Sequence, residues 1–253
     1  MQETLMNRLT WMEYQGLVQD GHVPVFLPVG ALEQHGPHLP LGTDAILASA
    51  VAQDVARATS GLAAPALAYG YKSQPKCGGG QHFPGTTSLD AMTLAHTVRD
   101  TVREFARHGV HKLVIVNGHY ENQWFLIEGI DLAMRELGKT KLTIMRLEYW
   151  DFFTAPTLAK AFPDGFPGYA LEHAAVLETS MMLHYQPELV RLDRIPSDPA
   201  ADFPPYDIYP TRTEWVPPSG VLSSAKAATK DKGAAMAQEL TTLISAAVRK
   251  EFQ

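Results

Sequence analysis

The sequence predicts an α/β protein in which helices cover both faces of a mainly parallel sheet. Four short apolar runs are nearly continuous in hydrophobicity and are bounded by Gly, Asn or Pro, a pattern typical of strands buried on both faces. Longer segments with helical spacing separate these runs. Because the two kinds of segment alternate along the chain, we expect a three-layer α/β/α arrangement.

The individual elements can be placed in order from local signals. The apolar runs predict strands at 23–29, 62–68, 112–116 and 142–147. Helical spacing predicts helices at 44–58, 88–108, 122–137, 172–185 and 229–252. Thr43 and Ser88 are expected to cap the first two helices, and Gly109 and Gly138 follow the ends of the second and third.

One segment, residues 196–220, fits neither pattern. It holds seven of the eighteen prolines but also carries several aromatic side chains. We therefore expect a long ordered loop rather than a linker between domains. The loop can pack on its own subunit or reach a neighbouring one, because loops of this length are usually functional or disordered.

Composition limits the possible functions. The chain has 253 residues, of which 45% are hydrophobic and 19% charged, enough for one large domain or two small ones. A formal net charge of −6 argues against a nucleic-acid partner. Cys77 is the only cysteine, so no intramolecular disulfide can form and we expect a cytoplasmic setting. We expect neither a signal peptide nor a membrane helix, because no charged segment precedes an apolar run and no apolar stretch is long enough.

Carboxylate and imidazole side chains follow two of the predicted strands. Glu33 and His35 follow the first strand, and His119 and Glu121 follow the third. Residues two apart in an extended segment project to the same side. Ligands of open α/β sheets bind at the carboxyl ends of strands, where Asp44 supplies a further carboxylate.

This set of side chains indicates a divalent metal centre. Imidazole suits zinc and related metals, and carboxylate suits manganese and magnesium. One catalytic metal normally takes three protein ligands, so five ligands with one shared carboxylate make two sites. Asp44 is the natural bridge, because it has no imidazole two residues away. His38 is a candidate sixth ligand, but its position three residues along a turn favours an orienting role or exposure to solvent.

Other catalytic patterns fit less well. There is no G-x-S-x-G nucleophile elbow, and residues 80–87 resemble a P-loop but carry Thr86 where a lysine is required. Cys77 beside Lys76 could be a reactive thiol, although a small pocket-lining residue is the simpler interpretation. His173 could transfer the protons that metal-bound imidazoles cannot, or it could be an exposed residue at a helix start.

Several separated blocks of the chain resemble the creatininase family. They are LPVGALEQHG, YGYKSQ, GGGQHFPGTTSLD, NGHYENQWFLIEGIDLAMREL, LEHAAVLETS, FPPYD and LSSAK, and the similarity runs from Leu9 to the C-terminal helix. The resemblance implies a single creatininase-like metal hydrolase domain over 1–253, with two divalent metal ions, zinc and/or manganese. It also implies assembly as a homohexamer.

The resemblance further implies roles for individual residues. One metal would be held by Glu33, Asp44 and His119, and the second by His35, Asp44 and Glu121. Glu121 and His173 would be catalytic. The substrate would contact a set of pocket residues, namely Cys77, Tyr120, Trp150, Tyr169 and His173.

The implied reaction is the opening of a small cyclic amide, creatinine to creatine, by hydroxide generated at the metals. Three pocket positions depart from the family pattern, with Cys77 in place of Ser, Tyr169 in place of Trp and Ala170 in place of Asp. These departures keep open a family hydrolase acting on a different small lactam, amide or formamide. A metal-binding protein without catalysis is the third alternative.

Overall fold

The computed structural model describes residues 3–73 and 80–252. Its four strands form one parallel sheet in the order β2-β1-β3-β4. The strands are β1 (Val25–Val29), β2 (Leu62–Ala63), β3 (Lys112–Asn117) and β4 (Thr143–Glu148). The predicted parallel sheet is therefore confirmed.

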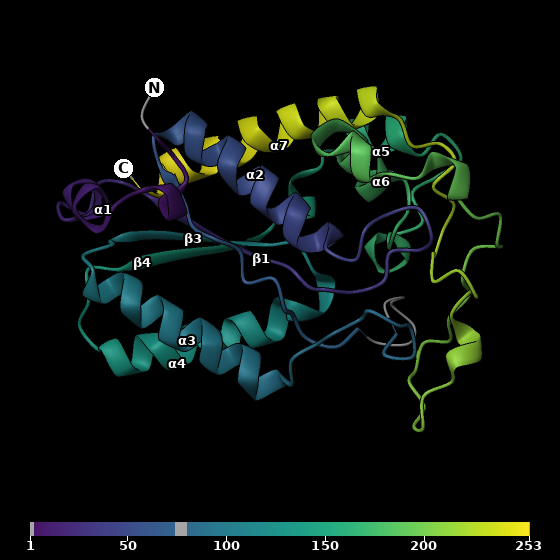
Figure 1. The fold of residues 1–253 in the computed structure, drawn as a ribbon, viewed down its shortest axis with the longest axis horizontal. Coiled ribbons are helices and arrows are strands. Elements are labelled where there is room, and N and C mark those ends of the chain that lie inside the picture. Colours follow the sequence, from purple (N-terminus) through teal and green to yellow (C-terminus); the bar gives the residue numbers. More distant parts are fainter. Residues whose placement is uncertain (1–2, 74–79, 253) are drawn as a thin grey trace.

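Helices cover both faces of this sheet (Figure 1). Helices α3 (Ala91–Arg107) and α4 (Gln123–Leu137) cover one face, where Leu27 and Ile115 join their apolar side chains in a core cluster. Helices α2 (Thr43–Thr59), α6 (Val176–Tyr185) and α7 (Lys230–Glu251) share a second cluster with Phe26 and Val114. Adjacent strand residues thus point to opposite cores, as a pleated strand requires. The shorter helices are α1 (Trp11–Val18) and α5 (Ala155–Ala161).

Several predicted boundaries were wrong for identifiable reasons. Strand β2 is only two residues long, because its ladder to β1 loses register after Ala64: the next bond to β1 comes from the backbone nitrogen of Leu67 rather than from that of Ala66. The N-cap of α3 is Asp90 rather than Ser88, and the N-cap of α2 is Gly42 rather than Thr43. Helix α6 begins at Val176 instead of residue 172. The chain before it forms a 3-10 turn at Tyr169–Leu171 and then a left-handed residue at Ala174 (φ 55°).

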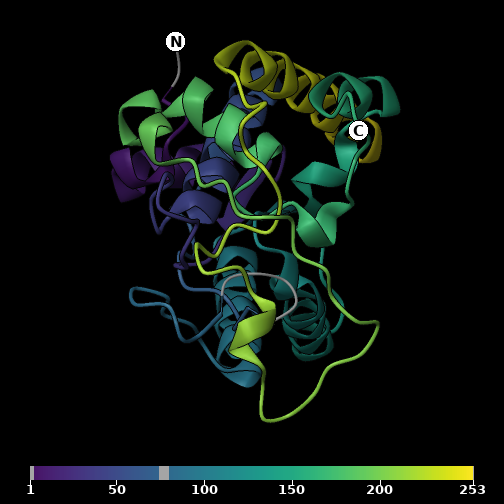
Figure 2. The ribbon, with the colours of Figure 1, turned by 90° about the vertical axis from the view of Figure 1, so that its right-hand side faces the viewer.

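The proline-rich segment 196–220 packs in part against its own chain. Val216 and Leu222 form a small third core with Ala201, and Phe83, Leu171 and Phe203 pack against it. The segment runs as a long loop at one end of the molecule, and Figure 2 looks onto that end. Tyr206 and Tyr209 within it are exposed. Contact with a neighbouring subunit stays a prediction.

No helix among the described residues has the length and apolar character needed to cross a membrane.

Candidate metal centre

The register of the sheet brings the two polar loops together. Val29 at the end of β1 lies opposite Asn117 at the end of β3. The glycine after each strand allows the first turn of α2 to pack directly on these ends. A Cβ on Gly30 would lie 2.4 Å from the backbone nitrogen of Ala45, and one on Gly118 would lie 2.6 Å from the carbonyl oxygen of Asp44. These close contacts place Asp44 between the two loops.

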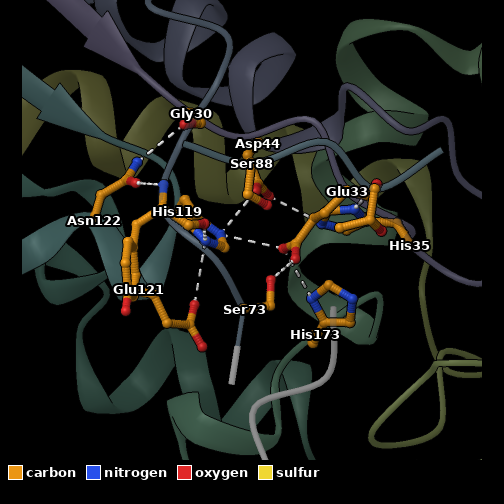
Figure 3. A network of polar contacts seen from close by, with 12 residues as sticks. Gly30, Glu33, His35, Asp44, Ser73, Ser88, His119, Glu121, Asn122 and His173 are labelled. Carbon is orange, nitrogen blue, oxygen red and sulfur yellow. Dashed lines mark hydrogen bonds and ion pairs between the residues drawn. The ribbon is translucent and has the colours of Figure 1, made fainter. Parts of the chain in front are cut away.

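The first ligand cluster contains Glu33, Asp44 and His119, all buried. Nδ1 of His119 lies 3.2 Å from Oε1 of Glu33 and 3.1 Å from Oδ2 of Asp44. Figure 3 shows these three side chains converging, with Ser73 donating a hydrogen bond to the other carboxylate oxygen of Glu33. The structure thus brings together the three residues that the family resemblance implied for one metal.

The second cluster contains His35, Asp44 and Glu178. Nε2 of His35 lies 2.9 Å from Oδ1 of Asp44 and 3.7 Å from Oε1 of Glu178. The two oxygens of Asp44 therefore face different imidazoles, which is the geometry of a bridging carboxylate. Glu121 was expected at this second site, but its Oε2 lies 3.4 Å from Nε2 of His119 instead.

Helix α6 presents Glu178 from its first turn. Its Oε2 accepts a hydrogen bond from the backbone nitrogen of Ala174 at 2.6 Å, which leaves Oε1 facing His35. Glu172 supports the same turn by accepting from the backbone nitrogen of Leu177 at 2.6 Å. The sequence analysis missed the place of Glu178 in this cluster, because no spacing relates it to ligands more than a hundred residues earlier.

The pKa values of the buried ligands are set by neighbouring charges, which outweigh the effect of burial. Burial alone lowers the pKa of His35, but the carboxylates of Asp44 and Glu178 outweigh it and hold this pKa well above 6.5. Burial is likewise outweighed at His119, where Glu33 and Asp44 raise the pKa. At Asp44, burial acts to raise the pKa, but the two imidazoles lower it below its usual range. The buried carboxylates therefore favour positive charge in their midst.

The arrangement of donor atoms fits a divalent cation. Nε2 of His35 and Oδ2 of Asp44 are buried and have no hydrogen-bond partner within the described part of the chain. Imidazole nitrogens and carboxylate oxygens that converge at about 3 Å without hydrogen-bond alignment are the ligand set of zinc or manganese. A cation at this place would replace the charge that the imidazolium groups otherwise carry.

Asparagine side chains hold the two loops in place. Asn122 donates to the carbonyl oxygen of Gly30 at 3.0 Å and accepts from the backbone nitrogen of Tyr71 at 2.8 Å. Asn117 accepts from the backbone nitrogen of His119 and donates to its carbonyl oxygen. Asn122 thus connects three loops, as Figure 3 shows for its bond to Gly30, while Asn117 fixes the backbone of the loop that carries His119.

His173 lies at the rim of the same centre. Its Nδ1 is 3.6 Å from Oε1 of Glu33, and its ring stands 4.4 Å from that of His35. It groups with these two residues as a third possible ligand set. Burial, reinforced by the charge of His35, lowers the pKa of His173. The alternative of an exposed residue at a helix start was wrong, because the side chain is buried.

A pocket opens from the metal centre and has an aromatic wall. The rings of Tyr120 and Trp150 are stacked with centroids 6.3 Å apart, and Tyr169 and Ala170 line the same pocket. Tyr120, Trp150 and Tyr169 are expected substrate-contacting side chains, and a fourth, His173, lines the same pocket. Cys77, the remaining one, lies outside the described residues.

His38 is not part of any ligand cluster among the described residues. It is buried, so the expectation of solvent exposure was wrong, and its Nε2 lies 3.0 Å from the hydroxyl oxygen of Thr179. Thr179 follows Glu178 in α6, so this contact connects the loop after His35 to the helix that carries Glu178. An orienting role, the other expectation for His38, agrees with this geometry.

Comparison with known proteins identifies the family. The creatininase family model, described as creatinine amidohydrolase, matches residues 7–248. The chain belongs to the creatininase family. It is 49% identical to creatinine amidohydrolase of Pseudomonas putida over 251 residues, which cover 98% of this chain and 96% of that protein.

Solved structures of creatininases match over the same extent. A crystal structure of creatinine amidohydrolase is 48% identical, with a TM-score of 0.97 and coverage of 100% of this chain and 99% of that one. A mutant creatininase complexed with creatine is 47% identical, with a TM-score of 0.96 and coverage of 99% of both chains. A Zn–Zn form of a mutant creatininase matches at 47% identity, with a TM-score of 0.97 and coverage of 100% of this chain and 99% of that one.

Proposed function

We propose that this chain hydrolyses creatinine to creatine at a two-metal centre. One observation carries the site assignment: the carboxylate of Asp44 faces His119 with one oxygen and His35 with the other. The similarity to creatinine amidohydrolase over nearly the whole chain supports the substrate. Zinc or manganese are the proposed ions, because both ligand clusters combine imidazole with carboxylate.

The protein side chains have distinct parts in this proposal. Divalent ions held by the two clusters would lower the pKa of water toward 7 and polarise the amide carbonyl. His173, whose Nδ1 lies 3.6 Å from Oε1 of Glu33, would give a proton to the ring nitrogen that leaves. Glu121 lines the same pocket and can take up the proton released by the attacking water. Tyr120, Trp150 and Tyr169 would exclude solvent from the ring of the substrate.

A second candidate is a different small lactam, amide or formamide. The methyl group of Ala170 and the phenol of Tyr169 at the pocket favour it, because neither offers a carboxylate to a cationic substrate. A metal-binding protein without catalysis is the remaining candidate. The position of His173 at the ligand cluster disfavours it.

Turnover of creatinine by the purified protein tests the proposal. We expect creatine to form with zinc or manganese supplied and not in a sample treated with a chelator. Absence of turnover while two metal ions per chain are bound would overturn the creatinine assignment. A panel of small lactams, amides and formamides would then identify the substrate of the same hydrolytic centre.

Three features of the whole protein belong to the same proposal. The chain would act as one metal hydrolase domain, since both ligand clusters lie at one edge of one sheet. It would work in the cytoplasm, because its single cysteine suits a reducing compartment. It would assemble as a homohexamer, as the family resemblance implies.

A further inference from the structure

Gln34 lies between two proposed ligands, Glu33 and His35, and its side chain is buried. Oε1 of its amide accepts a hydrogen bond from the backbone nitrogen of Gly36 at 2.8 Å. Nε2 of the amide donates to the carbonyl oxygen of Gly220 at 3.0 Å. These two bonds fix which end of the amide points which way, because one partner can only donate and the other can only accept.

The NH₂ end of the same amide also faces His173. Nε2 of Gln34 lies 3.1 Å from Nε2 of the imidazole, and the backbone carbonyl oxygen of Gln34 lies 2.9 Å from it. The carbonyl can bond to this ring nitrogen when it carries a hydrogen, and the amide can bond to it when it does not. One residue therefore supplies a partner for Nε2 of His173 in either tautomer.

The contacts with Gln34 hold the His173 ring on the side that faces away from the metal centre. The opposite nitrogen, Nδ1, lies 3.6 Å from Oε1 of Glu33 on the side of the metal centre, as Figure 3 shows. With Nε2 held by Gln34, the ring cannot rotate about its χ angles without losing a buried hydrogen bond. The exchangeable position at Nδ1 stays directed toward the site.

The end of the proline-rich segment completes the support. Gly220 has a φ of 79°, and a Cβ there would lie 2.1 Å from Oε1 of Gln34. Two residues later, the backbone nitrogen of Leu222 donates to the carbonyl oxygen of His173 at 3.3 Å. Leu222 is itself anchored in the third core cluster. This segment thus holds both Gln34 and the backbone of His173.

We propose that Gln34 is a positioning residue that, braced by Gly220, fixes the orientation of the His173 imidazole. Its effect on turnover rests on the proposed function, but the orientation of the ring does not. Loss of the Gln34 amide would leave substrate binding and the metal ligands unaltered. It would affect the proton-transfer step, through the position of His173. Small misplacements of a catalytic group reduce turnover steeply.

The variant Gln34→Met tests this inference, because methionine keeps the length of the side chain and removes its amide. We expect kcat to fall about 10- to 100-fold, with KM and metal content close to wild type. In a crystal structure of the variant, the ring of His173 should leave its wild-type position or occupy more than one rotamer. An unmoved ring would overturn the inference whatever the substrate is, and so would an unchanged kcat with an active wild type.

A pair of glycine variants gives an independent test without touching the ligand loop. In Gly220→Ala the new methyl group would clash with the amide of Gln34 and displace it, so we expect kcat to fall in this variant as well. Gly138→Ala is the matched control, because Gly138 also has a positive φ, 58°, but open space around its Cβ position. Equal kcat values in these two variants would contradict a positioning role for the contact between Gly220 and Gln34.

Discussion

The hydroxyl of Tyr169 donates a hydrogen bond to the backbone carbonyl oxygen of Trp150 at 2.7 Å. Both residues line the pocket. Burial raises the pKa of Tyr169 to about 12, so the phenol keeps its proton at neutral pH. Gly165 and Gly168, which precede Tyr169, have positive φ values of 109° and 94° and open space at their Cβ positions. The hydroxyl therefore fastens this loop in addition to the packing of Phe166 against the ring of Tyr169.

Replacing Tyr169 with Phe should loosen this loop while keeping the aromatic wall. Loss of one hydrogen bond of about 1 kcal/mol corresponds to roughly a five-fold weaker closure, so we expect KM for the substrate to rise by up to that factor. Steady-state kinetics would measure it. Tyr185→Phe is the matched control, because its hydroxyl makes an equally short bond to Asp54 away from the pocket. An equal rise in KM in both variants would contradict a local role for Tyr169.

Replacing His173 with Ala should abolish most turnover and leave both metals bound. Its Nδ1 approaches Glu33, but each of the two clusters that share Asp44 is complete without it. General acid catalysis contributes about 100- to 10,000-fold, and we expect kcat to fall within that range. Metal analysis together with kinetics makes the measurement, with His184→Ala on α6 as the control. Wild-type activity of the His173 variant would refute the proton-donor role.

Replacing Glu121 with Gln should weaken one metal site more than the other. The amide keeps an oxygen ligand but loses the charge, and Glu33, Asp44 and His119 still complete the first cluster. Stepwise removal by a chelator, followed by counting metal ions per chain, would reveal the difference. Glu178→Gln is the matched variant, because Glu178 is the carboxylate grouped with His35 and Asp44. If only Glu178→Gln releases metal early, Glu178 completes the second site instead of Glu121.

His38 should make folding sensitive to acid. Burial, and next the charge of His35, lower the pKa of His38 to about 4 from its usual 6.5, and the charge of His173 acts in the same direction. Between these values the unfolded chain binds more protons than the folded one, so the free energy of unfolding falls as the pH drops from about 6.5 to 4. Over this pH range, the protonation of His38 in the unfolded chain lowers the free energy of unfolding by about 3 kcal/mol in all.

Urea unfolding of metal-free protein across this pH range would measure the effect. In His38→Gln, the loss of stability between pH 6.5 and 4 should be smaller than in the wild type. His96→Gln provides a control, because His96 is an exposed histidine on α3. If the free energy of unfolding depended on pH in the same way in all three proteins, the burial of neutral His38 would not cause the acid sensitivity.

The local sequence pattern was sufficient to predict the parallel sheet and most of the residues of the ligand clusters. The buried strands β1 and β3 are visible as apolar runs, and the polar residues that follow them must meet because parallel strands end at the same edge. Helix ends were less predictable. Helix α6 begins four residues later than expected, because Glu172 and Glu178 bond to the backbone nitrogens of Leu177 and Ala174 and support a non-helical turn.

The sequence by itself determined the α/β class and the polar pairs at the ends of two strands. The five candidate ligands also predicted two metal sites that share Asp44, and the family resemblance added the ligands of each site and the reaction. The tertiary structure alone decided that Glu178 joins His35, that Gln34 holds His173, and that the proline-rich segment supports both. Most of these contacts join residues more than a hundred positions apart, such as Gln34 and Gly220. Hydrophobic periodicity reports which face of an element is buried, but which distant side chains meet there depends on how the loops pack.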